Sequence, residues 1–183
     1  MSIEYPNIMT ECNVDTNVVS YLMNGTVNHQ KGCGNVANIL EHNFPDKFAI
    51  GIIDNDRIKI PYLDKCKEIT SSSHLHVLRH CTYPHYIIVV GEKDKAMDRF
   101  IWDCAKEQKI NLGDHNLPSD FDAFKDRMKK KTSNNDPDVR SLVIAISCNK
   151  EVDTLRKLLK YLKDKLYQSK QEDIINLFEK SAE

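Results

Sequence analysis

The chain lacks any apolar run of about 18 residues, which is the length that a membrane-spanning helix requires. Its N-terminal segment has no basic region followed by an apolar stretch, and its six cysteines include no Cys-x-x-Cys pair. These absences argue against a membrane protein, an exported protein and a disulfide-stapled scaffold. We therefore expect a cytoplasmic protein with reduced thiols and no membrane partner.

Other absences narrow the function. The sequence has no G-x-x-x-x-G-K-[ST] motif, so any ATPase activity would have to come from a separate partner subunit. It has no aromatic residues alternating with basic ones, the pattern typical of single-strand stacking surfaces. The net charge is only −1, yet residues 125–183 hold 14 of the 26 basic residues. Positive charge is thus concentrated in the C-terminal third, without by itself indicating a nucleic-acid-binding protein.

The length of 183 residues, with 40% hydrophobic and 29% charged residues, fits one globular domain with a helical appendage. Strand and helix patterns alternate over the first 90 residues, which predicts right-handed crossovers and a mostly parallel sheet with flanking helices. The later patterns are helical, although LVIAI (residues 142–146) fits a strand equally well. We predict an α/β domain over residues 1–110 and a helical extension over 111–183, packed on or beside it. The expected strands cover residues 7–11, 26–30, 47–53, 74–80 and 85–90, and the expected helices cover 15–23, 31–43, 97–105, 137–146, 152–166 and 174–178.

Acidic residues follow two of the expected strands. The segment FAIGIIDNDR (residues 48–57) is apolar until Ile53 and then presents Asp54 and Asp56. Glu11 ends an earlier strand, and Asp15 lies four residues later at the start of a helix. Because ligands of parallel sheets bind at the carboxyl ends of the strands, Glu11 would lie beside Asp54 if these strands are neighbours.

Converging carboxylates repel one another unless a cation lies between them, and Mg²⁺ prefers one or two carboxylates together with water and phosphate oxygens. The pattern therefore predicts a Mg²⁺ (or Mn²⁺) site that faces a phosphate-bearing substrate. Two plainer interpretations stay open. Asp-Asn-Asp is also a common polar turn, and Asp15 would interact favourably with a helix dipole in any protein.

A glycine-containing turn lies between the second expected strand and the following helix, at Lys31, Gly32, Gly34 and Asn35. Glycines at such a place allow the backbone to approach an anion at the helix N-terminus. A tight strand-to-helix turn would have the same composition. With Arg57, these residues are the candidates for binding a phosphate or a nucleic-acid backbone.

An acid after the first strand, a glycine turn after the second and Asp-x-Asp after the third together resemble the TOPRIM domain. This catalytic module occurs in bacterial primases, topoisomerases, small RNA-maturation nucleases and overcoming-lysogenization-defect (OLD) nucleases. The resemblance covers about residues 5–105. Its first motif corresponds to Met9–Asp15 and its second to Ile52–Asp56. The sequence departs from the family at Cys12, where glycine is common, and at Arg57, after which no glycine follows soon.

The resemblance implies that Glu11 and Asp15 are catalytic and that Glu11, Asp54 and Asp56 bind metal. Glu92, or alternatively Asp98, is a weaker candidate for a second metal. It implies Mg²⁺-dependent hydrolysis of DNA or RNA by a small nuclease, which acts as a homodimer or with a separate partner and serves bacterial defence against phage. Space is lacking for the additional domains of topoisomerases and primases. The main alternative is a catalytically silent TOPRIM-like binding or regulatory subunit.

Other classes fit less well. A response-regulator receiver needs adjacent acids after its first strand, whereas Glu11 and Asp15 are four residues apart. A phosphatase of the haloacid dehalogenase type has Asp-x-Asp after its first strand, whereas Asp54 and Asp56 follow the third expected strand here. A zinc site is a further alternative, because His74, His76 and His80 would lie on one strand face near Cys81 and His85, although their spacing matches no common zinc motif.

Overall fold

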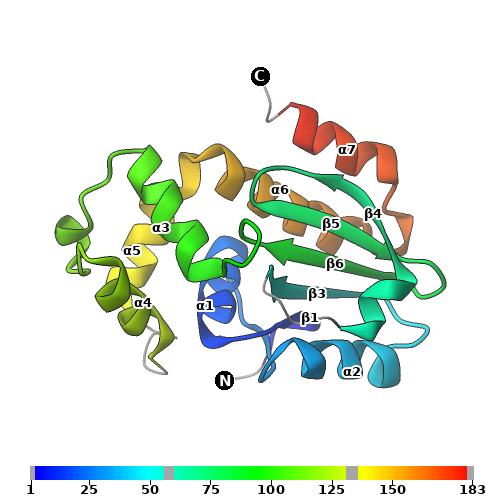
Figure 1. Cartoon of the computed structure of the whole chain (residues 1–183). Helices are drawn as coiled ribbons and strands as arrows, with labels where there is room; N and C mark the ends of the chain where they lie inside the picture. The colour runs from blue at the N-terminus through cyan, green and yellow to red at the C-terminus, as the bar shows by residue number, and fades with distance from the viewer. Residues whose placement is uncertain (1–2, 56–59, 131–135, 181–183) are drawn as a thin grey trace.

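The computed structural model describes residues 3–55, 60–130 and 136–180. A six-stranded sheet with the order β2-β1-β3-β6-β5-β4 forms its centre (Figure 1). Pairings β1–β2, β1–β3 and β3–β6 are parallel, and β6–β5 and β5–β4 are antiparallel. This confirms an α/β fold with a mostly parallel sheet. The strands are β1 (Tyr5–Thr10), β2 (Val27–His29), β3 (Ala49–Asp54), β4 (Cys66–Ser71), β5 (Leu75–His80) and β6 (His85–Val90).

Helices cover both faces of the sheet. They are α1 (Asn13–Met23), α2 (Cys33–Asn43), α3 (Met97–Glu107), α4 (Phe121–Lys129), α5 (Pro137–Ala145), α6 (Lys150–Lys165) and α7 (Gln171–Glu179), with short 3₁₀ turns η1 (Pro61–Lys65), η2 (Leu112–His115), η4 (Ile146–Cys148) and η5 (Leu166–Gln168). Helix α2 and the η1 segment contribute the buried residues on one face, and helices α1 and α3–α7 contribute those on the other. In Figure 1, α3, α4 and α5 gather beyond the end toward which the arrows of β3 and β6 point. The carboxyl ends of the parallel strands therefore face a group of helices.

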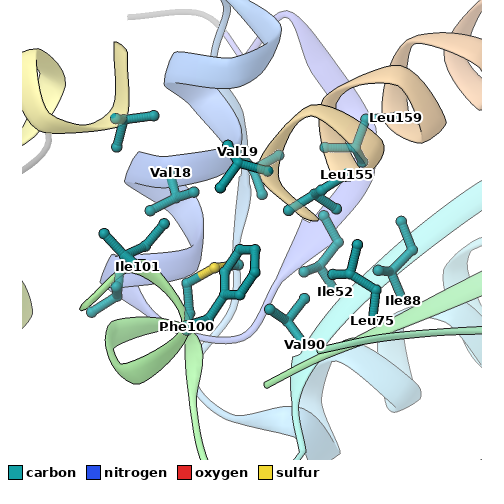
Figure 2. Packing of buried hydrophobic residues seen from close by; sticks show 14 of the residues in the cluster. Val18, Val19, Ile52, Leu75, Ile88, Val90, Phe100, Ile101, Leu155 and Leu159 are labelled. Carbon is teal, nitrogen blue, oxygen red and sulfur yellow. The ribbon is translucent and has the colours of Figure 1, made fainter. Parts of the chain in front are cut away.

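The larger core lies between the sheet and the second set of helices. In Figure 2, Val18 and Val19 of α1 and Leu155 and Leu159 of α6 lie over Ile52 of β3 and the neighbouring strands. These residues are at most 1% exposed. The same cluster includes residues on both sides of position 110, so the predicted division into residues 1–110 and 111–183 stays a prediction, while the C-terminal helices share one core with the sheet.

Gly51 explains how closely helix α2 approaches β3. A Cβ atom at Gly51 would lie 3.0 Å from side-chain carbons of Val36, Leu40 and Ile87. A buried strand usually favours β-branched residues, but at this position only hydrogen leaves room for the helix. The smaller core forms around this contact.

The structure corrects two features of the expected sheet. We did not predict β4, an edge strand with charged residues whose alternation is weak. The β5–β6 pair is antiparallel because only the four residues 81–84 connect the strands, whereas a parallel pair needs a crossover of a dozen or more residues. The segment LVIAI lies in α5 and η4 and is not a strand. Asp136 caps α5 by accepting a hydrogen bond from the Asp138 amide, with Pro137 in the first turn.

Candidate acidic site at the carboxyl edge of the sheet

The carboxyl ends of β1 and β3 lie side by side. The two strands are parallel neighbours, with Thr10 opposite Ile52. The Glu11 amide donates to the carbonyl of Ile52 over 3.1 Å, which extends the pairing by one residue. The expected proximity of Glu11 and Asp54 is therefore confirmed.

Backbone amides hold three carboxylates in this region. Glu11 Oε2 accepts a hydrogen bond from the Asp54 amide (3.1 Å), and Asp54 Oδ1 accepts one from the Met97 amide at the start of α3 (2.9 Å). Asp15 Oδ2 accepts one from the Cys12 amide (3.0 Å), which closes the first turn of α1. Each carboxylate is thus oriented by a backbone amide of another segment or turn.

Cys12, Asp15 and Asp54 form a compact set of potential metal ligands. The sulfur of Cys12 and one oxygen from each aspartate all lie within 4.8 Å of one another. Within residues 3–55, 60–130 and 136–180, this is the only such group of three or more histidine, cysteine or acidic side chains. Asp15 is 1% exposed, and its Oδ1 atom has no hydrogen-bond partner among the residues that the structure describes. A buried carboxylate oxygen without a partner is costly, so the geometry fits a cation or a bound proton at this place.

The electrostatics of the cluster agree with this interpretation. Burial raises the pKa of Asp15 well above its ordinary value, and the neighbouring charges of Asp54 and Glu11 raise it further. Burial, followed by the charges of Asp15 and Asp54, likewise raises the pKa of the Cys12 thiol. All these effects disfavour negative charge, and a divalent cation would reverse them.

A cavity of about 370 Å³ opens over the cluster. Its lining consists of Glu11, Cys12, Asn13, Val14, Asp54 and Lys129. A second cavity of about 220 Å³ also contacts Lys129 and is lined by Lys95, Arg99 and Lys125 in addition to Asp94 and Asp98. The acidic cluster therefore borders a region that contains four basic side chains. This combination suits a ligand with a metal-binding anionic group and further negative charge.

Lys129 is the connection between the two cavities. Its side chain is 52% exposed, and Nζ lies 3.7 Å from Oδ2 of the buried Asp98. An exposed lysine at this distance gains little from the ion pair and can turn toward a ligand. Its aliphatic portion extends from the last turn of α4.

The predicted glycine turn lies next to the cluster. Gly32 has φ = 99°, a conformation that favours glycine, and its amide donates to the carbonyl of Glu11 over 3.0 Å. Asn35 Nδ2 donates to the carbonyl of Lys31. The turn therefore supports the backbone of the site through Gly32, while anion binding by Lys31, Gly34 and Asn35 stays a prediction.

The remaining candidates lie elsewhere. Asp56 and Arg57 fall outside the described residues. Glu92 follows β6, forms an ion pair with Lys95 and lies 3.7 Å from His74 Nε2. Among the described residues, Glu92 is not part of the ligand group, so its role as a second metal ligand stays a prediction.

The histidines near β5 do not form a metal site in the described part of the chain. His76 Nδ1 lies 3.0 Å from Glu68, whereas His80 Nδ1 accepts hydrogen bonds from the amides of Thr82 and Tyr83. His74 packs against the ring of Phe100. Because each ring serves a different local contact, the zinc interpretation of these residues loses its basis.

Sequence reasoning missed Cys12 as a potential ligand and Lys129 as a wall of the cavity. Cys12 stood next to a predicted site residue and has a ligand side chain, so its position was a usable signal. No signal in the sequence pointed to Lys129, because it lies more than a hundred residues after Glu11 and reaches the site only through the packing of α4.

The fold and the site define an α/β protein with an acidic cluster at the carboxyl edge of its parallel strands. No family model, no curated protein and no solved structure matches this chain. No helix in the described part of the chain combines the length and the apolar character that crossing a bilayer requires. Any assignment of function therefore depends on the site itself.

Proposed function

We propose that this chain is a metal-dependent nuclease of the TOPRIM type that hydrolyses phosphodiester bonds in DNA or RNA. The main supporting observation is the convergence of Glu11, Asp15 and Asp54, each held by a backbone amide, beneath a cavity that leads to basic side chains. The order of these acids along β1, α1 and β3 matches the family motifs. The proposal includes a role in defence against phage, which rests on the resemblance alone.

The proposed cation, Mg²⁺ or Mn²⁺, would be held by Asp54 and Asp15, and Glu11, which is not in the ligand group of the described residues, would lie beside it. When bound, such an ion polarises a phosphate and lowers the pKa of a coordinated water. Lys129 would contact a non-bridging phosphate oxygen, and Lys95, Arg99 and Lys125 would follow the adjacent backbone. Glu11, which lines the cavity, is the proposed proton acceptor for the attacking water.

A catalytically silent binding subunit is the second candidate. It is favoured by the fact that the same three carboxylates perform structural tasks. Asp54 caps α3, Asp15 closes the first turn of α1 and Glu11 joins β1 to β3. These bonds alone would be a sufficient reason for acidic residues at the three positions.

Cleavage assays separate the two candidates. Plasmid, single-stranded DNA and RNA are incubated with Mg²⁺ or Mn²⁺ and either the wild type, Asp54→Asn or Glu11→Gln. Both substitutions keep an oxygen that accepts the structural hydrogen bond, so they remove charge with little change of fold. Glu179→Gln, at an exposed position of α7, is the matched control.

We expect cleavage by the wild type and the control, inhibition by EDTA and a loss of at least a hundredfold in both site variants, of the order seen when one preorganised catalytic group is removed. Equal cleavage by all four proteins would indicate a contaminating nuclease and refute the proposal. Metal binding measured by calorimetry without cleavage of any substrate would favour the silent subunit.

A further inference from the structure

Cys12 distinguishes this cluster from a site built of carboxylates alone. The residue lies at the N-terminal end of α1, directly between Glu11 and the first helical turn. Its sulfur is within 4.8 Å of ligand oxygens of both Asp15 and Asp54. We propose that Cys12 is a metal ligand and that the cluster prefers a thiophilic divalent cation, Zn²⁺ or Co²⁺, to Mg²⁺. This inference rests on the proposed metal site of the nuclease and concerns which divalent cation the site binds most tightly, whereas Mg²⁺ or Mn²⁺ is the ion proposed to support cleavage.

The spacing of Cys12 and Asp15 favours joint binding. Cys12 is the N-cap residue of α1 and Asp15 lies three positions later in its first turn, which is the spacing of a capping box. The hydrogen bond from the Cys12 amide to Asp15 Oδ2 fixes their relative position. Asp54 approaches from β3, where the Met97 amide holds its Oδ1 atom. A cation would therefore meet three ligands whose backbones are already positioned.

Asp15 supplies independent evidence for a ligand. Its side chain is almost completely buried, and within the described part of the chain Oδ1 has no hydrogen-bond partner, whereas Oδ2 accepts from the Cys12 amide. A purely structural aspartate in this turn needs only the bond to Cys12. Asp15 also supplies one oxygen to the ligand group with Cys12 and Asp54, so a cation held there would be a partner for its carboxylate.

The chemistry of the ligand set determines the preferred ion. Mg²⁺ binds hard oxygen ligands and seldom accepts sulfur, whereas thiolate ligands favour Zn²⁺ and related ions. One sulfur and two carboxylates make three protein ligands, which leaves a position for water or substrate on a four-coordinate ion. That position would open toward the cavity that Glu11 and Lys129 also line.

Binding through sulfur requires the thiolate. The S–H bond of Cys12 breaks heterolytically, its electron pair forms the bond to the cation, and one proton passes to the solvent. No oxidant or reductant takes part. Metal binding therefore releases the thiol proton, which a variant without the thiol does not carry.

The test measures binding directly and does not depend on nuclease activity. The metal-free protein is titrated with Co²⁺, Zn²⁺ and Mg²⁺ by calorimetry in two buffers of different ionisation enthalpy, and the Co²⁺ complex is recorded by absorption spectroscopy. Cys12→Ser and Cys12→Ala remove the ligand. Cys81→Ser and Cys148→Ser, at exposed thiols, are matched controls. Thermal unfolding confirms that each variant is folded.

We expect a sulfur-to-cobalt charge-transfer band in the wild type and in both controls, and its loss in the two Cys12 variants. Affinity for Co²⁺ and Zn²⁺ should fall at least tenfold in these variants, since loss of even an outer partner of a ligand costs about 10- to 100-fold. Affinity for Mg²⁺ should stay the same.

A cobalt complex without the band, or a band that survives in both Cys12 variants, would overturn the inference. Absence of any cobalt binding would do the same. The outcome is separable from the proposed nuclease: Mg²⁺-dependent cleavage without a sulfur band supports the nuclease and removes this inference. A sulfur-to-cobalt band without cleavage of any substrate supports the Cys12 ligand and counts against the nuclease.

Discussion

The substitution Asp15→Asn should stabilise the metal-free protein, although it removes an acidic residue from the first turn of a helix. In the wild type, Oδ1 of this buried side chain lacks a hydrogen-bond partner in residues 3–55, 60–130 and 136–180, and two further carboxylates lie nearby. An asparagine retains an oxygen for the Cys12 amide, and its N–H groups would have the carboxylates of Asp54 and Glu11 nearby as acceptors. The repulsion within the cluster is thereby reduced.

The expected size follows from two opposing contributions. Relief of an unsatisfied buried polar atom contributes about 1 to 3 kcal/mol, and loss of the favourable charge near the N-terminus of α1 costs about 0.3 to 1 kcal/mol. A net gain of about 1 to 2 kcal/mol corresponds to an increase in Tm of roughly 2 to 8 °C for a chain of this length.

Urea unfolding in EDTA, followed by fluorescence, measures this change. Trp102 is the single tryptophan, is 8% exposed and packs on Phe121 and Phe124, so its emission reports loss of the core. Asp122→Asn is the matched control, because Asp122 occupies the first turn of α4 at an exposed position. That variant should lose a few tenths of a kcal/mol. A decrease in stability for Asp15→Asn similar to that of the control would refute the argument from repulsion.

Three further predictions concern packing, pH and ligand binding. Gly51→Ala should lower the free energy of unfolding by about 1 to 2 kcal/mol, because the added carbon would meet three side chains at 3.0 Å. Gly34→Ala, which has open space around it in α2, should raise the free energy of unfolding by about 0.5 to 1 kcal/mol in the same thermal unfolding experiment. Asp136→Asn should cost about 1 to 2 kcal/mol at pH 7, since the Asp136 carboxylate pairs with Arg127 and caps α5. Although burial raises the pKa of Asp136, hydrogen bonds from Arg127 and from the Asp138 amide outweigh it and lower the pKa overall. Because the pKa of Asp136 is lower in the folded state than in the unfolded state, its charge stabilises the fold above the unfolded-state pKa. This stabilisation is lost as the pH falls through the folded-state pKa. The difference in free energy of unfolding between wild type and Asp136→Asn, measured in urea, should therefore shrink between pH 5 and about pH 2. Lys129→Gln should weaken nucleic-acid binding and reduce the slope of log K against log salt by about 1 in a fluorescence-anisotropy titration.

Each of these predictions has a clear contrary result. A neutral Gly51→Ala would show that α2 can move away from β3. A stability difference for Asp136→Asn that stays constant with pH would show that Arg127 does not recognise the charged form. An unchanged salt slope for Lys129→Gln would remove the lysine from the proposed nucleic-acid path.

Much of the sheet is predictable from the sequence because its strands have a simple pattern. The run from Phe48 to Ile53 is apolar and partly β-branched, as expected of a strand covered on both faces, and it forms β3. The short link between residues 80 and 85 also contained the information that β5 and β6 are antiparallel, because it is too short for a crossover. The edge strand β4 was harder to predict, because Lys67 and Glu68 interrupt its apolar character.

Only the residues at the strand ends of the candidate site were predictable from the sequence. The positions of Glu11 and Asp54 follow from strand ends and from the adjacency of β1 and β3. The hydrogen bond between Asp54 and Met97 and the arrival of Lys129 depend on the docking of α3 and α4, which no local pattern encodes. Likewise, the unsatisfied oxygen of Asp15 is a property of packing and not of residue type.

The parallel pairing of β1 with β3 has a consequence for how the protein opens. Glu11 and Asp54 are 43 residues apart in the sequence, and their arrangement depends on a few hydrogen bonds from backbone amides, such as the one from Glu11 to Ile52. Contacts between distant segments form late in folding and can be lost in a local opening before the whole core unfolds. Local unfolding that detaches only β1 would separate Glu11 from Asp54 while β3, β5 and β6 stay paired. Amide exchange at Glu11 and Asp54 would then be faster than at Ile87 and Ile88, and a cation that bridges the two strands would slow it.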